Sequence, residues 1–147
     1  MASNYSYQHL DKETMAVASG RNLSISMKKT VELARAIQGK KVKVAISYLE
    51  KVIDKKVAVP YRRFKQEVPH QRGKGIDTGG YPVNVAKEVL KLLKSAQKNA
   101  SEKELGDNLF VVSISARKGA SRYHPGRYVG RRMKVTNVEV VVGVKEW

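Results

Sequence analysis

The sequence predicts a domain of mixed helices and strands that carries one long basic hairpin. Two apolar runs, at residues 109–114 and 138–142, are rich in β-branched side chains and are typical of strands. Three other segments, within 26–39, 42–53 and 83–99, repeat apolar residues at helical spacing. With 147 residues, of which 41% are hydrophobic, the chain can bury the core of one domain.

The chain begins with a polar segment, and regular secondary structure is predicted after it. Residues 1–14 are polar, and we expect a flexible extension there, followed by a single domain over 15–147. Residues 15–23 could form a short strand. In the helix that follows, Ser26 suits the N-cap and Gly39 suits the position after the last turn.

Each of the next two helices has one apolar face. The helix over 42–53 carries Ala45, Leu49 and Val52 on one side, and a short turn joins it to the first helix. We therefore expect these two helices to pack as an antiparallel pair. The helix over 83–99 has an apolar stripe and, opposite it, a lysine face that is either solvated or in contact with a polyanion. The stripe comprises Val85, Val89, Leu92, Leu93, Ala96 and Ala100.

The two strands should alternate their side chains between two faces. Phe110, Val112 and Ile114 are expected to share one face of the first strand. We predict that the two strands pair as an extended hairpin over 109–142. With about 12 residues per arm at ~3.3 Å per residue, the hairpin would reach about 40 Å. Because the rest of the domain would have a radius of gyration of only about 13 Å, much of the hairpin would project from it. On the second strand, the residues expected on one face are Val138, Val140 and Val142.

The charge balance indicates a polyanionic partner. The chain has 29 Lys and Arg against 13 Asp and Glu, a net charge of +16. A membrane surface is the competing polyanion, but no long apolar run, lipidation signal or basic amphipathic helix with large aromatics occurs. No secretory signal is recognised, so a cytoplasmic location and no membrane contact are expected. The absence of cysteine excludes disulfides and cysteine-ligated zinc.

The segment between the two strands is basic and lacks Asp and Glu. A lone hairpin is marginal in water, and its like charges repel. RNA would order it, because basic side chains displace counterions from phosphates while Tyr and Arg stack on unpaired bases. The alternative is a disordered basic loop. The candidate RNA-binding residues here are Arg117, Lys118, Arg122, Tyr123, His124, Arg127, Tyr128, Arg131, Arg132 and Lys134.

Residues 55–82 contain three prolines and several glycines and therefore predict a long loop. Such a loop in a compact domain is usually functional or disordered. Basic residues alternate there with Tyr61, Phe64 and Tyr81, a mixture that suits phosphate contacts together with base stacking. The alternative is a solvated loop. The candidate RNA-binding residues here are Arg62, Arg63, Lys65, His70, Arg72 and Lys74.

Catalytic chemistry has little support in the sequence. His9, His70 and His124 lie far apart and lack metal-ligand spacing. No pair of carboxylates suggests acid–base work, and no nucleophile motif is present. We therefore expect no catalytic, cofactor-binding or metal-binding residues and a protein that is not an enzyme.

Several motifs, taken together, resemble one known family. Residues 25–39 look like the first helix of the universal large-subunit ribosomal protein L-twenty-two family. Residues 59–64, with 70–73 and 80–82, look like the loop found in the archaeal and eukaryotic forms. Residues 86–93 and 99–100 resemble the family's third helix, and 116–119, 125–131 and 137–140 resemble its extended hairpin. The likeness covers roughly residues 15–142.

The resemblance implies an α+β fold, with three helices packed on a three-stranded antiparallel sheet and a long protruding β-hairpin. It implies a structural constituent of the large ribosomal subunit that binds large-subunit rRNA and supports subunit assembly and translation. The hairpin would line the nascent-peptide exit tunnel, facing ribosomal protein L-four and the nascent polypeptide, with residues 122–132 as the tip. The return strand after Pro125 is several residues shorter than the family pattern. The alternatives are a non-ribosomal RNA- or DNA-binding module and an RNA-modifying enzyme.

Overall fold

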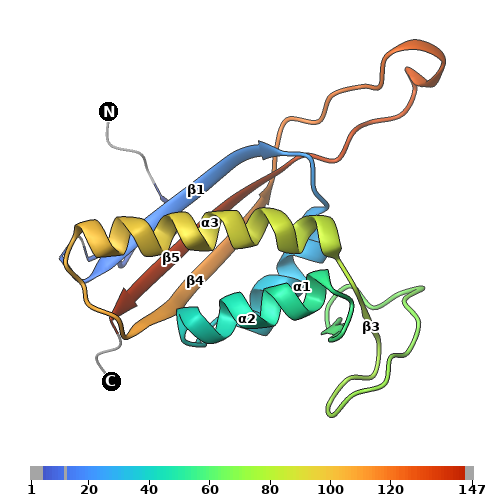
Figure 1. Cartoon of the computed structure of the whole chain (residues 1–147). Helices are drawn as coiled ribbons and strands as arrows, with labels where there is room; N and C mark the ends of the chain where they lie inside the picture. Colours follow the sequence, from blue (N-terminus) through green and yellow to red (C-terminus); the bar gives the residue numbers. More distant parts are fainter. Residues whose placement is uncertain (1–4, 12, 145–147) are drawn as a thin grey trace.

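The computed structural model describes residues 5–11 and 13–144. It has the predicted α+β composition, with helices and strands interspersed along the chain (Figure 1). The predicted flexible extension falls partly on residues 1–4 and 12, and the predicted domain ends at 145–147, all outside the described residues. In chain order the elements are β1 (Met15–Leu23), α1 (Met27–Ile37), α2 (Val42–Ile53), β2 (Val59–Pro60), β3 (Gly79–Gly80), α3 (Val83–Glu102), β4 (Leu109–Lys118), the short 3-10 helix η1 (Gly126–Tyr128) and β5 (Thr136–Val144).

The main sheet is antiparallel, with strand order β1-β5-β4. The last strand of the chain is therefore the central one, paired on both sides. A central strand beneath helices buries its side chains, and Val138, Val140 and Val142 are all fully buried as predicted. The three-stranded antiparallel sheet is confirmed.

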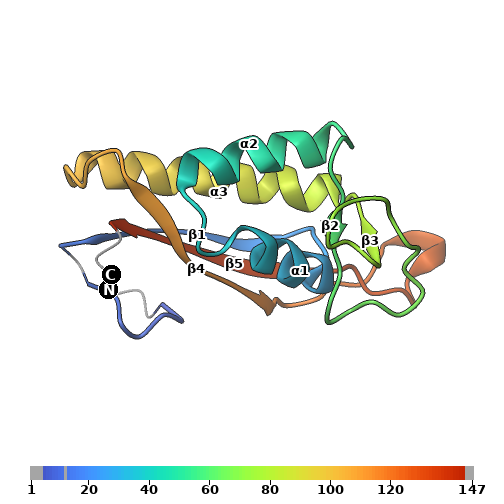
Figure 2. The same ribbon diagram turned by 90° about the horizontal axis from the view of Figure 1, so that it is seen from below.

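Helices α3 and α2 form a layer over one face of the sheet (Figure 2). Helix α3 packs against β1 and β5, while α2 packs mainly against α3 and α1 mainly against β4. Leu33 of α1, Leu49 of α2 and Leu93 of α3 are fully buried in one core. Burial of each such side chain contributes roughly 1.5–3 kcal/mol.

The expected packing of α1 and α2 as an antiparallel pair is wrong. The turn between them hydrogen-bonds to β4, because the Gly39 N–H donates to the Val111 carbonyl at 2.8 Å and the Val111 N–H donates to the Lys40 carbonyl at 2.9 Å. This attachment keeps α1 on β4 and directs α2 onto α3.

The predicted alternation on β4 is also wrong. The pairing register with β5 shifts between Val111 and Ser113, so Val112 is the extra residue of a β-bulge. Because the bulge resets which side chains point inward, Leu109, Val111 and Ile114 are buried. Phe110 and Val112 do not share a face with Ile114.

The hairpin formed by β4 and β5 continues past the sheet. Ladder pairing extends from Leu109 to Lys118, four residues beyond the predicted strand. Farther out, the Gly119 N–H donates to the Val135 carbonyl at 2.9 Å, and the Met133 N–H donates to the Arg122 carbonyl at 2.7 Å. The outer segment projects away from the helices and the sheet (Figure 1). Within the described part of the chain, no helix is both long enough and apolar enough to span a bilayer.

Candidate nucleic-acid interface

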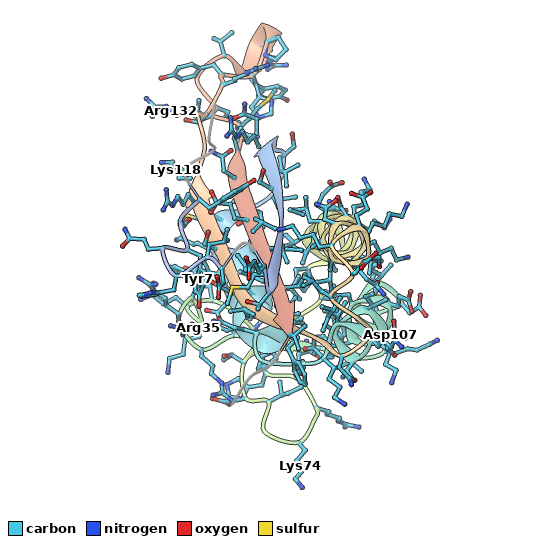
Figure 3. All side chains as sticks on the ribbon, turned by 90° about the vertical axis from the view of Figure 1, so that its left-hand side faces the viewer. Tyr7, Arg35, Lys74, Asp107, Lys118 and Arg132 are labelled. Carbon is cyan, nitrogen blue, oxygen red and sulfur yellow. The ribbon has the colours of Figure 1, made fainter. Side chains whose placement is uncertain are left out.

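The sixteen residues predicted to bind RNA lie on the surface. All of them are exposed except His124, which is half-buried. The structure gathers them into two groups, one on the hairpin and one on the loop between α2 and α3. In Figure 3, Lys118 and Arg132 lie toward the projecting hairpin, and Lys74 lies at the far end of the molecule. The two predicted groups are therefore separate surfaces.

The outer hairpin presents aromatic rings beside arginines. Tyr123 and Tyr128 are 55% and 57% exposed, which is unusual for large rings and leaves their faces open. The Tyr123 hydroxyl accepts hydrogen bonds from Nε and Nη2 of Arg132, at 3.1 and 2.9 Å, across the hairpin. The Arg131 guanidinium lies 5.2 Å from the centre of the Tyr128 ring. These contacts hold both arginines near open π-faces.

Within the part of the chain that the structure describes, the hairpin cations have no acidic ion-pair partners. Among the described residues, the ion pairs are Lys56–Asp54, His70–Asp77 and Lys91–Glu88, and none of them is on the hairpin. Where the hairpin leaves the body, Lys118, Arg132 and Lys134 line a groove of about 360 Å³ together with Lys28 from the start of α1. Lys28 was not predicted. It is brought to the hairpin only by the packing of α1 beside β4.

The loop between α2 and α3 is held by its own hydrogen bonds. Strands β2 and β3 pair through Val59 and Gly80. The Tyr61 N–H donates to the Thr78 carbonyl at 2.8 Å, and the Thr78 hydroxyl donates to the Tyr61 carbonyl at 2.7 Å. At the outer end, His70 Nδ1 lies 2.9 Å from an Asp77 carboxylate oxygen. The loop is therefore an ordered platform for its basic side chains.

One predicted stacking residue has a different role. Tyr61 is only 8% exposed and belongs to the core, so its ring cannot stack on a base. Burial, followed by the charge of Glu32, raises the pKa of the Tyr61 hydroxyl. Tyr81 is 37% exposed. Phe64 is half-buried beneath Lys28 and Arg63.

A buried carboxylate anchors the basic loop to α1. Glu32 is 1% exposed, and it accepts hydrogen bonds from the backbone N–H groups of Arg62, Arg63 and Phe64 at 2.9, 2.7 and 2.7 Å. Burial alone would raise the pKa of this carboxyl, but the three hydrogen bonds and the charge of Arg35 outweigh it and lower the pKa. Glu32 therefore stays ionised and fixes the start of the loop.

Sequence reasoning missed the role of Glu32. The available signal was a lone carboxylate between the apolar Val31 and Leu33, in a helix that is otherwise basic. Nothing in the pattern identified its partners, because they lie about thirty residues farther along the chain. No cluster of three or more His, Cys, Asp or Glu suited to a metal ion occurs among the residues that the structure describes.

Comparison with known proteins decides the family. The sequence profile of "Ribosomal protein L22p/L17e" matches residues 18–143. The chain belongs to this ribosomal protein family. The family recognised from the sequence motifs is thereby confirmed. Its match spans the sheet, the three helices, the basic loop and the hairpin.

Archaeal members of the family align with nearly the whole chain. The "Large ribosomal subunit protein uL22" of Archaeoglobus fulgidus is 41% identical, over 97% of this chain and 96% of that protein. The proteins of the same name from Methanosphaera stadtmanae and Methanococcus aeolicus are each 37% identical. Those alignments cover 96% of both chains for Methanosphaera, and 90% of this chain and 91% of the relative for Methanococcus.

Proposed function

We propose that this chain is a structural constituent of the large ribosomal subunit and that its hairpin and basic loop bind large-subunit rRNA. The observation that carries the proposal is the hairpin itself, which projects from the body with cations that have no acidic partners within the described residues. Family membership and the net charge of +16 support the same role.

The proposed mechanism is electrostatic positioning. Lys and Arg side chains neutralise phosphates where rRNA segments approach one another, and each contact releases counterions. Such contacts fix register and orientation without reading sequence, so the folded shape of the rRNA supplies the specificity. Tyr123 and Tyr128 add open rings on which unpaired bases can stack. A two-stranded hairpin that is marginal in water becomes rigid once RNA surrounds it.

The hairpin further suits a place along the nascent-peptide exit tunnel, beside ribosomal protein L-four. Its tip is narrow, being a 3-10 turn at Gly126–Tyr128 closed by a hydrogen bond from the Arg131 N–H to the Tyr128 carbonyl. Val129, which is 60% exposed, and Tyr128 offer apolar surface to a passing chain. The proposed setting is the cytoplasmic ribosome, and the proposed role is structural rather than catalytic.

Ultraviolet crosslinking tests the proposal directly. Assembled large subunits that contain this protein are irradiated, and crosslinked peptides and nucleotides are mapped by mass spectrometry and primer extension. We expect crosslinks between rRNA and residues 117–134. Hairpin peptides that crosslink to no rRNA, or a protein that leaves large subunits during sucrose-gradient sedimentation in moderate salt, would contradict the proposal. Modified nucleosides formed when purified protein is incubated with rRNA would instead favour the enzyme alternative.

A further inference from the structure

A basic hollow lies between α1, α2 and the start of the loop, away from the hairpin. Its volume is about 500 Å³, which is within the range of roughly 300–1,000 Å³ typical of small-molecule sites. Three cations line it: Arg35 from α1, Lys40 from the turn after α1, and Arg62 from the loop. Of these, only Arg62 was predicted to bind RNA.

The three cations in the hollow have no ion pairs among the described residues. Glu32 also lines the hollow, but its two carboxylate oxygens already accept three backbone N–H groups. These amides stabilise the carboxylate without cancelling its charge, so three cations face one anion in the hollow. The hollow as a whole keeps an excess of positive charge, which favours an anionic ligand.

The remaining walls provide an aromatic ring and an apolar side. The Lys40 ammonium lies 4.5 Å from the centre of the Tyr48 ring, a cation–π contact that holds the cation within the hollow. Burial raises the pKa of the Tyr48 hydroxyl, so this group stays protonated and can donate a hydrogen bond. Ala36 and Pro60 supply apolar surface beside the charges.

We propose that this hollow binds one nucleotide of an RNA strand, with its phosphate between Arg35, Lys40 and Arg62 and its sugar and base against Ala36 and Pro60. The volume suits a whole nucleotide rather than a phosphate alone. Arg35 points to the same side of the molecule as Lys118 and Arg132, whereas Asp107 lies on the opposite side (Figure 3). One RNA face can therefore include both the hollow and the hairpin. The inference rests on the proposed rRNA binding but concerns a separate site.

A charge-matched pair of double variants tests the site. In full-length protein, Arg35→Gln with Lys40→Gln removes two charges from the hollow. Lys43→Gln with Lys51→Gln removes two charges from exposed positions on α2 that do not line the hollow. Binding is measured against Archaeoglobus fulgidus large-subunit rRNA over a range of salt concentrations.

We expect the hollow variant to lower the affinity by about tenfold or more, since two charge-assisted contacts are lost. Its salt dependence should weaken by about 1.4 in the log–log slope, at roughly 0.7 for each lost contact to single-stranded RNA. The α2 variant should change the affinity by less than about twofold. Equal losses in the two variants would mean that only net charge matters and would overturn the site.

A hairpin variant separates this inference from the proposed function. Suppose that Arg127→Gln with Arg131→Gln weakens rRNA binding while the hollow variant does not. The proposed nucleotide site in the hollow is then wrong, and the proposed function stands. If the hairpin variant binds as tightly as the unmodified protein, the proposed hairpin function fails. In that case, a loss confined to the hollow variant would still support the nucleotide site.

Two further measurements complete the test. Titration with UMP and AMP distinguishes a strand of RNA from a free nucleotide: weak binding that competes with rRNA is expected, and binding of either nucleotide more tightly than rRNA would overturn the assignment to RNA. Phenylglyoxal modification of Arg35 in the unmodified protein covers the case of a variant that fails to fold. Protection of Arg35 by rRNA is expected, and unchanged modification would overturn the proposal.

Discussion

Glu32 Oε1 accepts a hydrogen bond from the backbone N–H of Arg63 at 2.7 Å, which joins α1 to a loop residue 31 positions along the chain. The acceptor is buried and the donor's side chain is exposed. The basic loop is thus held by its backbone, and its guanidinium groups remain free to bind. The buried Glu32 carboxylate thus positions the exposed basic side chains at the start of this loop.

Glu32→Gln should destabilise the fold and loosen the loop. A neutral amide offers one oxygen to three N–H donors, and unsatisfied buried donors are costly, so we expect a loss of about 2–4 kcal/mol in the free energy of unfolding. Urea unfolding measures this loss. Hydrogen exchange should show faster exchange at the amides of residues 62–64. Glu50→Gln, at an exposed position on α2, is the control and should have little effect. Equal stability of the two variants would contradict the anchoring role.

The contribution of Glu32 should depend on pH in a defined direction. Because folding lowers the pKa of this carboxyl below its ordinary value of 4.5, its contribution is complete above about pH 4.5. It is lost as the pH falls through the lowered folded pKa. The difference in unfolding free energy between the unmodified protein and Glu32→Gln should therefore be constant near neutral pH and shrink in acid. A difference that grows on acidification would refute this assignment.

Removal of the outer hairpin should leave the domain folded. The core contains no side chain from residues 120–134, and the Gly119–Val135 hydrogen bond marks a point where the hairpin can be closed. Replacement of residues 120–134 by a short glycine-rich turn should change the melting temperature by less than about 4 °C. Circular dichroism tests this expectation. Affinity for rRNA should fall steeply and incorporation into large subunits should be impaired. An unfolded protein would contradict the expected stability, and normal subunit assembly would contradict the expected role of the hairpin.

The contact between Tyr123 and Arg132 should order the hairpin without stabilising the domain. Tyr123→Phe removes the oxygen that accepts both arginine hydrogen bonds but keeps the ring. Because the pair is exposed, we expect less than about 0.5 kcal/mol of change in global stability. Faster exchange of the His124 amide, which bonds to the Arg131 carbonyl at 2.9 Å, is the expected local effect. Tyr128→Phe is the matched control, and equal exchange in both variants would argue against the pairing.

Local patterns in the sequence were sufficient to predict the three helices. The predicted helix over 42–53 has the bounds of α2, and the helix over 83–99 falls short of α3 by three residues. Ser26 occupies the N-cap position of α1, although its side chain makes no capping hydrogen bond. These features follow from spacing and composition, which act over a few residues and can be recognised without knowledge of distant partners.

The basic character of the surface was also determined by the sequence. A charge of +16 cannot be compensated within the chain, so whichever way it folds, most Lys and Arg remain outside. That is why the predicted RNA-binding residues are exposed. Their assignment to rRNA contacts stays a prediction.

Only the tertiary structure decided which distant residues meet. It placed the Glu32 carboxylate on the backbone of Arg62–Phe64, joined Arg35, Lys40 and Arg62 in one hollow, and buried Tyr61. It also inserted a bulge at Val112 and directed α2 onto α3 instead of α1. Each of these outcomes depends on competition among contacts far apart in sequence, and periodicity within a segment carries no information about that competition.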